Sequence, residues 1–194
     1  GYKGKVEVVD NGSDFAGNFP VEQLRRSARD KLRLPSDEFM FLFVGQHIWE
    51  KNLEFLLEAL AEIRTLPFRM YFIGSGYAAS ELRRKTEDLY LTDKVIFMGS
   101  ITERERLKLY YAAADLFLFP SLYDNAPLVV REAAALHTPS LLIKGSTSAE
   151  VIHDSVNGFL SDNSVTAYAS RISQLLETPQ LIAEAGEAAS HSIA

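Results

Sequence analysis

The chain contains no cysteine, and its positive charges are outnumbered by its negative charges. The absence of cysteine excludes disulfide bonds and thiolate metal sites. With 20 lysines and arginines against 26 aspartates and glutamates, the formal net charge is −6. Proteins that bind nucleic acid as their main partner usually carry a basic surface, so this charge argues against such a partner.

Long hydrophobic runs are also missing. No apolar segment approaches the roughly 20 residues needed to span a bilayer, and no signal peptide opens the chain. A cytoplasmic protein is therefore the default expectation, with the inner face of the membrane as a second candidate location. The chain starts at Gly1 without an initiator methionine, and we expect it to be cut from a longer protein.

What the sequence does have is the composition of one ordinary globular domain, with 194 residues of which 47% are hydrophobic. Short β-rich runs alternate with longer segments of helical periodicity. Expected strands cover residues 6–9, 39–44, 69–73, 95–98, 116–119, 140–143 and 158–160, and expected helices include residues 50–63, 103–113, 164–177 and 179–190.

Several of these strands, such as "FMFLFV" and "LFLFP", are apolar on both faces. Such runs are typical of the centre of a parallel sheet that helices cover on both sides. We therefore predict an α/β fold with a doubly wound, Rossmann-like parallel sheet. Residues 1–20 are predicted to form a linker and the first-strand region, and residues 21–194 the domain itself.

In such a sheet, ligands bind beyond the carboxyl ends of the strands, so the loops that follow the strands are the candidate functional segments. Three of these loops begin at Gly45, Gly74 and Gly99, and glycine there permits close approach of the backbone to a ligand. "GSGYAAS" does not complete the dinucleotide fingerprint G-x-G-x-x-G, and no Walker lysine pattern occurs. Both absences argue against a conventional dehydrogenase or a P-loop enzyme.

The loop "PSLYDNAP" and the apolar segment after it carry two acids eight positions apart, Asp124 and Glu132. Pro127 suits the first turn of a helix, and Asn125 is a candidate cap just before it. Glu132 then falls inside the helix, about a turn and a half from its start.

The first turn of that helix would leave the backbone amides of Leu128 and Val129 free to bind an anion. An acid, free amides and a second acid in this order match the layout of a nucleotide sugar, which has sugar hydroxyls, a diphosphate and ribose hydroxyls. The alternative is structural: Glu132 pairs with a nearby arginine or lysine, or lies on a solvated face, since an unpaired buried acid is costly.

Over most of its length the sequence resembles the retaining GT-B glycosyltransferases of sequence family 4, the glycosyl transferases group 1. "FVGQHIWEKNLEFLLEAL" is similar to the family's F-V-G-R-L-x-x-E-K-G segment and its helix, and "MYFIGSG" and "VIFMGSI" are similar to the next two strands with their turns. "AADLFLFPSLYDNAPLVVREAAAL" resembles the segment with the Glu-x7-Glu motif, and "STSAEVIHDSVNGFL" the one that follows.

The resemblance implies a role for each matching residue. Glu132 would bind the ribose hydroxyls, Asp124 would contact the donor sugar near its anomeric centre, and Lys51 would hold the diphosphate and stabilise the leaving nucleotide. Asp124 and Lys51 are thus the expected catalytic residues. The expected binding set comprises Glu132, Lys51, Asp124, Gly45, Gln46, Asn125, Leu128, Val129, Gly74, Met98 and Gly99. Ser146 and Thr147 are further candidate donors to the sugar.

The sequence also departs from the family. Asp124 replaces a glutamate, Gln46 replaces a basic residue, Ala126-Pro127 stand where Phe-Gly is frequent, and Thr147-Ser148 replace Gly-Gly. His47 and Lys144 are candidate substitutes for the lost cation. The chain covers the donor half of the two-domain fold, so alone we expect it to bind nucleotide and to be inactive in transfer.

The resemblance also implies the partners. These are a nucleotide diphosphate sugar as donor and a saccharide or lipid acceptor that the missing N-terminal domain would bind, with peripheral membrane association of the full-length parent as a further expectation. No cofactor or metal is expected, and the spacing of His47, His137, His153 and His191 is poor for a metal site. Two alternatives stay open: a domain of another GT-B enzyme, such as a sugar-nucleotide epimerase, and a non-catalytic nucleotide-binding module.

Overall fold

The computed structural model describes residues 13–15, 17, 20–35, 38–124 and 127–193. Its strands are β1 (Phe39–Val44), β2 (Phe68–Ile73), β3 (Val95–Gly99), β4 (Leu116–Phe119), β5 (Ser140–Ile143) and β6 (Phe159–Ser161). Its helices are α1 (Val21–Lys31), α2 (Leu53–Glu62), α3 (Ala79–Asp88), α4 (Arg104–Ala113), α5 (Leu128–Ala135), α6 (Val165–Leu176) and α7 (Pro179–Ser192), with short 3-10 helices η1 (Trp49–Lys51) and η2 (Thr147–Val151).

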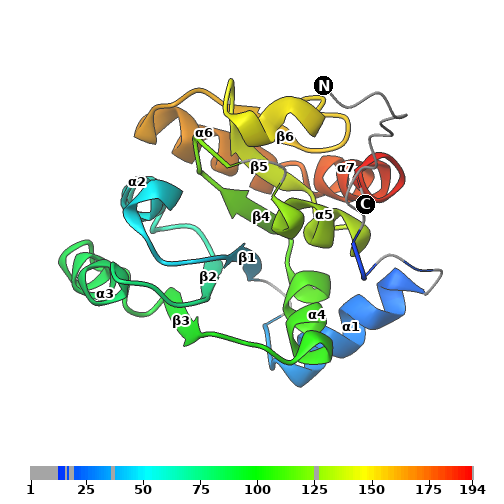
Figure 1. Cartoon of the computed structure of the whole chain (residues 1–194), viewed down its shortest axis with the longest axis horizontal. Helices are drawn as coiled ribbons and strands as arrows, with labels where there is room; N and C mark the ends of the chain where they lie inside the picture. Colours follow the sequence, from blue (N-terminus) through cyan, green and yellow to red (C-terminus); the bar gives the residue numbers. More distant parts are fainter. Residues whose placement is uncertain (1–12, 16, 18–19, 36–37, 125–126, 194) are drawn as a thin grey trace, which may run out of the picture.

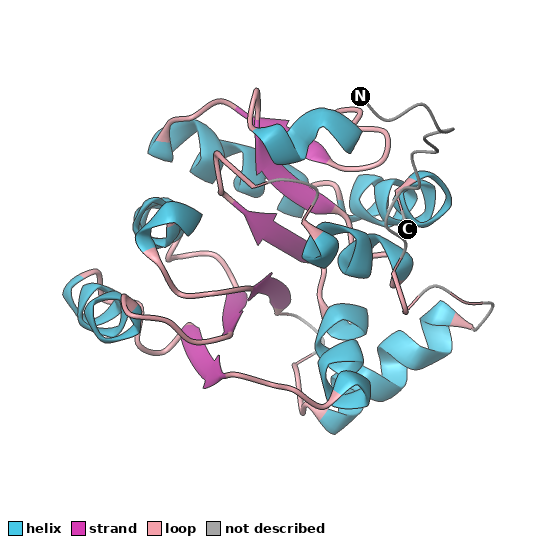
Figure 2. Cartoon of the chain, in the orientation of Figure 1, coloured by secondary structure: helices cyan, strands magenta, loops and turns pink. Residues whose placement is uncertain are grey.

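The six strands form one parallel sheet in the order β3-β2-β1-β4-β5-β6. Helices lie on both sides of it, with α2, α3 and α6 on one side and α1, α4, α5 and α7 on the other (Figures 1 and 2). This is the predicted doubly wound α/β fold. The expected strand at residues 6–9 lies outside the described residues, and the other six expected strands agree with the observed ones to within a residue at either end.

The apolar runs of the sequence explain which strands are central. All four residues of β4 and of β5 are buried, and five of the six residues of β1 are buried. By contrast, β3 lies at the margin of the sheet and is mostly half-buried. Central strands contact helices on both faces, so both sets of alternating side chains are removed from water.

The helices follow from amphipathic periodicity. In α2 the buried leucines Leu53, Leu56, Leu57 and Leu60 recur at the spacing of one helix face. In α5 the small side chains of Ala133, Ala134 and Ala135 are all buried. Their small size lets this helix approach the sheet and α7 closely, and it brings the neighbouring Glu132 into the interior.

Strand order fixes where a ligand site is expected. The chain moves from β1 outward to β2 and β3, and then returns to place β4 on the other side of β1. In doubly wound sheets the crevice at this switch point, beyond the carboxyl ends of the strands, is the usual ligand site. The loops that follow β1 and β4 are therefore the loops expected to bind a ligand.

Candidate functional site

The loops after β1, β2 and β3 pack backbone against backbone. The amide of Gly74 donates to the carbonyl of Gly99 at 2.9 Å. Gly74 has φ +137°, and a Cβ added there would lie 1.8 Å from the carbonyl oxygen of Gly45. Glycine is therefore required at position 74, because a side chain would separate the loops. Gly99 is the last residue of β3, whereas the sequence predicted it to follow the strand.

Two other predicted binding residues lie at this same end of the sheet. Gln46, directly after Gly45, is exposed, and Met98, within β3, is half-buried. Gln46 thus places an exposed, uncharged side chain in a loop where the resemblance implies a basic residue.

Lys51 and Asp124 meet at the switch point between β1 and β4. The Lys51 Nζ forms an ion pair with Asp124 Oδ2, and the two side chains are 19% and 20% exposed. Lys51 Nζ also lies 5.8 Å from the centre of the Phe119 ring, at the end of β4. The structure thus joins two predicted site residues that are 73 positions apart in the chain.

The backbone of Asp124 is fixed by the loop after β5. Its amide donates to Thr147 Oγ1 at 2.8 Å, and the Thr147 hydroxyl donates back to the Asp124 carbonyl at 3.0 Å. The hydroxyl of Ser148 donates to the same carbonyl at 3.1 Å. Thr147 and Ser148, which depart from the family's Gly-Gly, therefore position the loop that carries Asp124.

Helix α5 begins at Leu128, so Pro127 lies just before the helix, whereas the sequence predicted it within the first turn. Pro127 takes the cap position, with φ −65° and ψ 117°, instead of the first helical position. Leu128 is 51% exposed and Val129 is half-buried, and the first turn of any helix leaves its amides without partners inside the helix. Asn125, the predicted cap, lies outside the described residues.

Glu132 is 8% exposed, and both of its carboxylate oxygens have partners. Oε1 accepts a hydrogen bond from the Arg104 guanidinium at 2.8 Å, and Oε2 accepts one from the Tyr111 hydroxyl at 2.7 Å. The structural alternative raised from the sequence, pairing with an arginine, is therefore realised. It does not exclude ligand binding, since an ionised carboxylate has about four acceptor positions.

The protonation of the groups around Glu132 follows from burial and charge. Burial, and then the charge of Glu132, raise the pKa of Tyr111 well above its usual range, so its hydroxyl remains a donor. Burial opposes the charge on Arg104, but its hydrogen bonds to Asp14 and Glu132 outweigh this, and the pKa of Arg104 is raised. Both partners of Glu132 are thus donors at neutral pH.

Arg104 and Tyr111 were not among the site residues predicted from the sequence. They lie seven residues apart on α4, which is close to two helical turns, so both side chains emerge on one face. That spacing is visible in the sequence, but nothing local indicates that Glu132 lies opposite it. Their role follows from the packing of α4 beside α5.

His47 is also buried at this end of the sheet, with 2% exposure. Its ring lies among Phe43, Phe72 and Phe97, with centroid distances of 6.3, 6.1 and 5.9 Å, and its Nε2 has no hydrogen-bond partner among the described residues. Burial, followed by the charge of Arg83, lowers the pKa of His47. The ring is therefore neutral at pH 7 and is not a substitute for the cation missing at Gln46.

Two features are absent from the described part of the chain. Within it, no group of three or more histidines and acids lies close enough to hold a metal ion. None of the helices there combines the length and apolar character needed to cross a bilayer.

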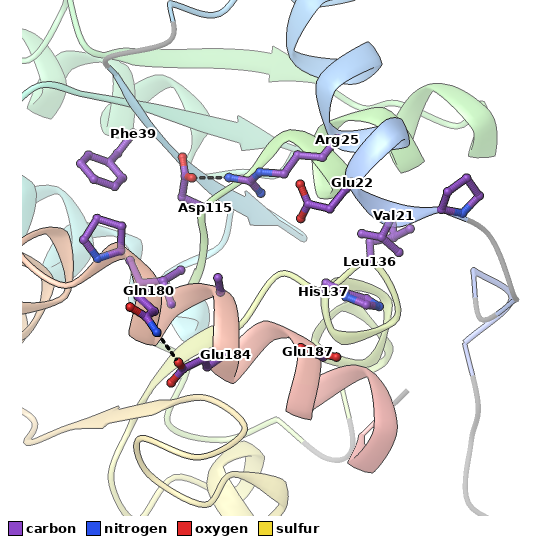
Figure 3. A pocket seen from close by; sticks show the side chains of 14 residues that line it. Val21, Glu22, Arg25, Phe39, Asp115, Leu136, His137, Gln180, Glu184 and Glu187 are labelled. Atoms are coloured by element: carbon purple, nitrogen blue, oxygen red, sulfur yellow. Dashed lines mark hydrogen bonds and ion pairs between the residues drawn. The ribbon is translucent and has the colours of Figure 1, made fainter.

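A cavity of about 770 Å³ lies at the opposite, amino end of the sheet, between α1 and α7 (Figure 3). Its wall includes the ion pair of Arg25 with Asp115, and His137, whose pKa is lowered chiefly by burial. None of the predicted site residues lines it. The cavity and the candidate site are thus separate features at the two ends of the strands.

Comparison with known proteins agrees with the family resemblance of the sequence. A family model for glycosyl transferases group 1 matches residues 25–192. D-inositol 3-phosphate glycosyltransferase 2 of Catenulispora acidiphila is 32% identical over 95% of this chain and 45% of its own length. The chain therefore spans less than half of this curated relative.

Two solved structures have the same fold. The C-terminal domain of a glycosyl transferase group 1 family protein (LpcC) from Francisella tularensis has a TM-score of 0.79 and 19% identity, with 96% of both chains covered. Anabaena HepE, solved with UDP and glucose, has a TM-score of 0.78 and 22% identity, with 94% of this chain and 50% of that chain covered. This chain belongs to the glycosyl transferases group 1 and corresponds to the C-terminal domain of a GT-B glycosyltransferase.

Proposed function

We propose that this chain binds the nucleotide diphosphate sugar donor of a retaining glycosyltransferase at the carboxyl end of its sheet. The observation that carries the proposal is the contact between Lys51 and Asp124 at the switch point. A cation on the loop after β1 and an acid on the loop after β4 converge there, beside the first turn of α5. Anabaena HepE, a structural neighbour, was solved with UDP and glucose, which supports this class of ligand.

Lys51 is proposed to stabilise the leaving nucleotide. When the bond between the sugar and the diphosphate breaks, negative charge develops on the diphosphate, and a fixed ammonium lowers the energy of that state. Lys51 is held by Asp124 and by the ring of Phe119, so little reorganisation is needed. The amides of the first turn of α5 would add positive potential on the same side.

Asp124 is proposed to face the donor sugar, and its negative charge opposes the binding of a free diphosphate. The ion pair with Lys51 is neutral overall, so a diphosphate that approaches Lys51 also meets the carboxylate of Asp124. Sugar hydroxyls can donate to that carboxylate and separate it from the diphosphate. The arrangement therefore favours an intact nucleotide sugar over the free nucleotide.

Glu132 is proposed to accept hydrogen bonds from the ribose hydroxyls with the acceptor positions that Arg104 and Tyr111 leave open. The acceptor substrate we propose is a saccharide or a lipid, bound by the remainder of the full-length enzyme, and a lipid acceptor would bring that enzyme to the inner face of the membrane. Neither a metal nor another cofactor is part of the proposal.

Titration calorimetry with UDP, GDP and ADP tests donor binding. We expect the wild type to bind one of them and Glu132→Ala to bind it at least tenfold more weakly, because a hydrogen bond to a charged group is lost. Glu38→Ala is a matched control, since Glu38 also pairs with an arginine, Arg69, but lies before β1 at the amino end of the sheet.

A folded wild-type sample that binds none of the three nucleotides at millimolar concentration would overturn the proposal. If binding is found, a glycosyl-transfer assay on the full-length parent distinguishes a transferase from a sugar-nucleotide epimerase or a non-catalytic module. The configuration of the product at the anomeric carbon, read by NMR, tests whether the transfer is retaining.

A further inference from the structure

The buried carboxylate of Glu132 is held from one side by the start of α4, and the start of α4 is held in turn by the segment before α1. Arg104 is the first residue of α4, and the NH2 nitrogen that donates to Glu132 also contacts Asp14. A second nitrogen of the same guanidinium, Nε, donates to Asp14 Oδ2 at 3.0 Å. One arginine therefore bridges two acids from distant parts of the chain.

Phe15 contacts both side chains that donate to Glu132. Its ring is 4% exposed, and the Arg104 guanidinium lies 4.1 Å from the ring centre. The same ring meets Tyr111 edge-on, with centroids 5.9 Å apart. Both donors to Glu132 thus rest on one aromatic ring, which limits the positions that either donor can adopt.

We propose that Arg104 is the positioning residue that orients the Glu132 carboxylate toward the ribose hydroxyls of the donor, with Phe15 as the main support of Arg104 and Asp14 as a minor one. The inference rests on the proposed function of Glu132. Its physical basis is that two fixed donors, one on each carboxylate oxygen, define the plane of the carboxylate and hence the direction of its remaining lone pairs.

The exposure of each contact indicates how much each residue contributes to the position of Glu132. The Arg104 side chain is 42% exposed, but the oxygen it binds belongs to a side chain that is only 11% exposed, where water does not easily replace a lost donor. Asp14 is 64% exposed, and its ion pair with Arg104 is open to solvent and screened by salt. Loss of Arg104 should therefore disturb Glu132 much more than loss of the Asp14 charge.

The test measures discrimination between a ribose and a deoxyribose. The affinity of the 194-residue chain for UDP is compared with its affinity for 2′-deoxy-UDP, and likewise for GDP and ADP with their 2′-deoxy forms. In the wild type we expect the ribonucleotide to bind about tenfold more tightly, because a ribose hydroxyl donates to a charged acceptor. Glu132→Gln should bring this ratio close to one.

Arg104→Gln should lower the ratio several-fold toward one, and Arg104→Lys should recover part of it, since a lysine keeps the charge without the planar fork. Asp14→Asn should change the ratio less than twofold. Arg171→Gln is the matched control: Arg171 also pairs with an acid, Asp154, and lies 5.5 Å from the Phe159 ring, but it belongs to α6. Its ratio should equal that of the wild type.

Because the ratio is measured within each variant, it is insensitive to a uniform loss of affinity or of stability. Tyr111→Phe keeps the ring and removes the other donor to Glu132. It should also lower the ratio of ribonucleotide to deoxyribonucleotide affinity, and it replaces Arg104→Gln if that variant does not fold. If Arg104→Gln keeps the wild-type ratio, the inference is overturned and the proposed function remains intact. The same holds for Tyr111→Phe when Arg104→Gln does not fold and Tyr111→Phe is measured in its place. A wild type that binds the two nucleotide forms equally overturns the ribose role of Glu132, and the inference with it.

Discussion

The charged side chains at the two ends of the sheet are partnered in different ways. At the amino end, Asp115 pairs with Arg25 and Arg29 and also accepts the Met40 amide at 2.7 Å, while Arg25 donates to the Ala114 carbonyl at 2.7 Å. At the carboxyl end, the side chains of Lys51 and Asp124 are joined to each other. The first arrangement satisfies backbone groups of the fold, and the second is built from side chains that a ligand could engage.

A large cavity therefore does not coincide with the candidate nucleotide site. The cavity of about 770 Å³ at the amino end lies beside charges that complete the termini of α4 and β1 (Figure 3). At the carboxyl end, Asp124 lies on the loop after β4, and Glu132 lies within α5. Substitutions at the two ends should therefore separate stability from nucleotide binding.

The largest expected effect is on stability, at the amino end. Asp115→Ala leaves Arg25 and Arg29 without their acid and the Met40 amide without its acceptor. We expect a loss of about 3 kcal/mol in the free energy of unfolding, measured by urea denaturation, with unchanged nucleotide affinity in the folded fraction. A variant of wild-type stability that no longer binds nucleotide would reverse the roles assigned to the two ends.

At the carboxyl end, Lys51→Gln should affect binding more than folding. Loss of the ammonium should weaken nucleotide binding by about 2 kcal/mol, which is roughly thirtyfold. The free energy of unfolding should fall by only about 1 kcal/mol, because the lost ion pair with Asp124 is partly exposed. Calorimetry and urea denaturation measure the two quantities.

The control for Lys51 is Lys85→Gln on α3, where Lys85 pairs with Glu54 and Glu58. It should leave nucleotide affinity unchanged. Equal losses of affinity in the two variants would mean that general positive charge, and not the switch point, attracts the nucleotide.

The substitution His47→Leu should change how the free energy of unfolding depends on pH. Because burial lowers the pKa of His47 in the folded state, the unfolded chain binds more protons just below pH 6.5, so this group makes wild-type stability fall as the pH drops through that range. Leucine removes this contribution, and at pH 7 it should add about 1 kcal/mol by removing an unpaired nitrogen from an apolar cluster.

Urea denaturation between pH 5 and 8 measures the effect, with the substitution expected to flatten the profile. His137 at the amino end, whose pKa burial also lowers, remains in both proteins and leaves a residual slope. Parallel profiles for wild type and His47→Leu would show that the buried ring does not contribute to the pH dependence.

The smallest expected effect has the opposite sign to that of Lys51→Gln. Asp124→Asn removes the carboxylate that competes with a diphosphate for Lys51, so free UDP, GDP or ADP should bind about threefold more tightly, a change below about 1 kcal/mol. The intact nucleotide sugar should gain less, because it loses an acceptor for its hydroxyls. Weaker binding of the free nucleotide would contradict the competition inferred from the ion pair.

Much of the fold could be predicted from the sequence, because strands and helices carry local periodic signals. The apolar runs of β1 and β4 mark central strands, and the leucines of α2 mark one helix face. Pro127 was predicted in the first turn of α5 but lies at its cap, because proline suits both positions. The roles of Glu132, Asp124 and Lys51 as donor-binding residues stay predictions until nucleotide binding is measured.

The strands, the order of the motifs and hence the family follow from the sequence, because these features depend on residues close together in the chain. Which side chains meet follows only from the tertiary structure. Lys51 reaches Asp124 across 73 positions because β1 and β4 are neighbours, and Arg104 reaches Glu132 across 28 positions because α4 packs beside α5. Such pairs leave no periodic signal, since they depend on how the sheet orders its strands and on how the helices pack.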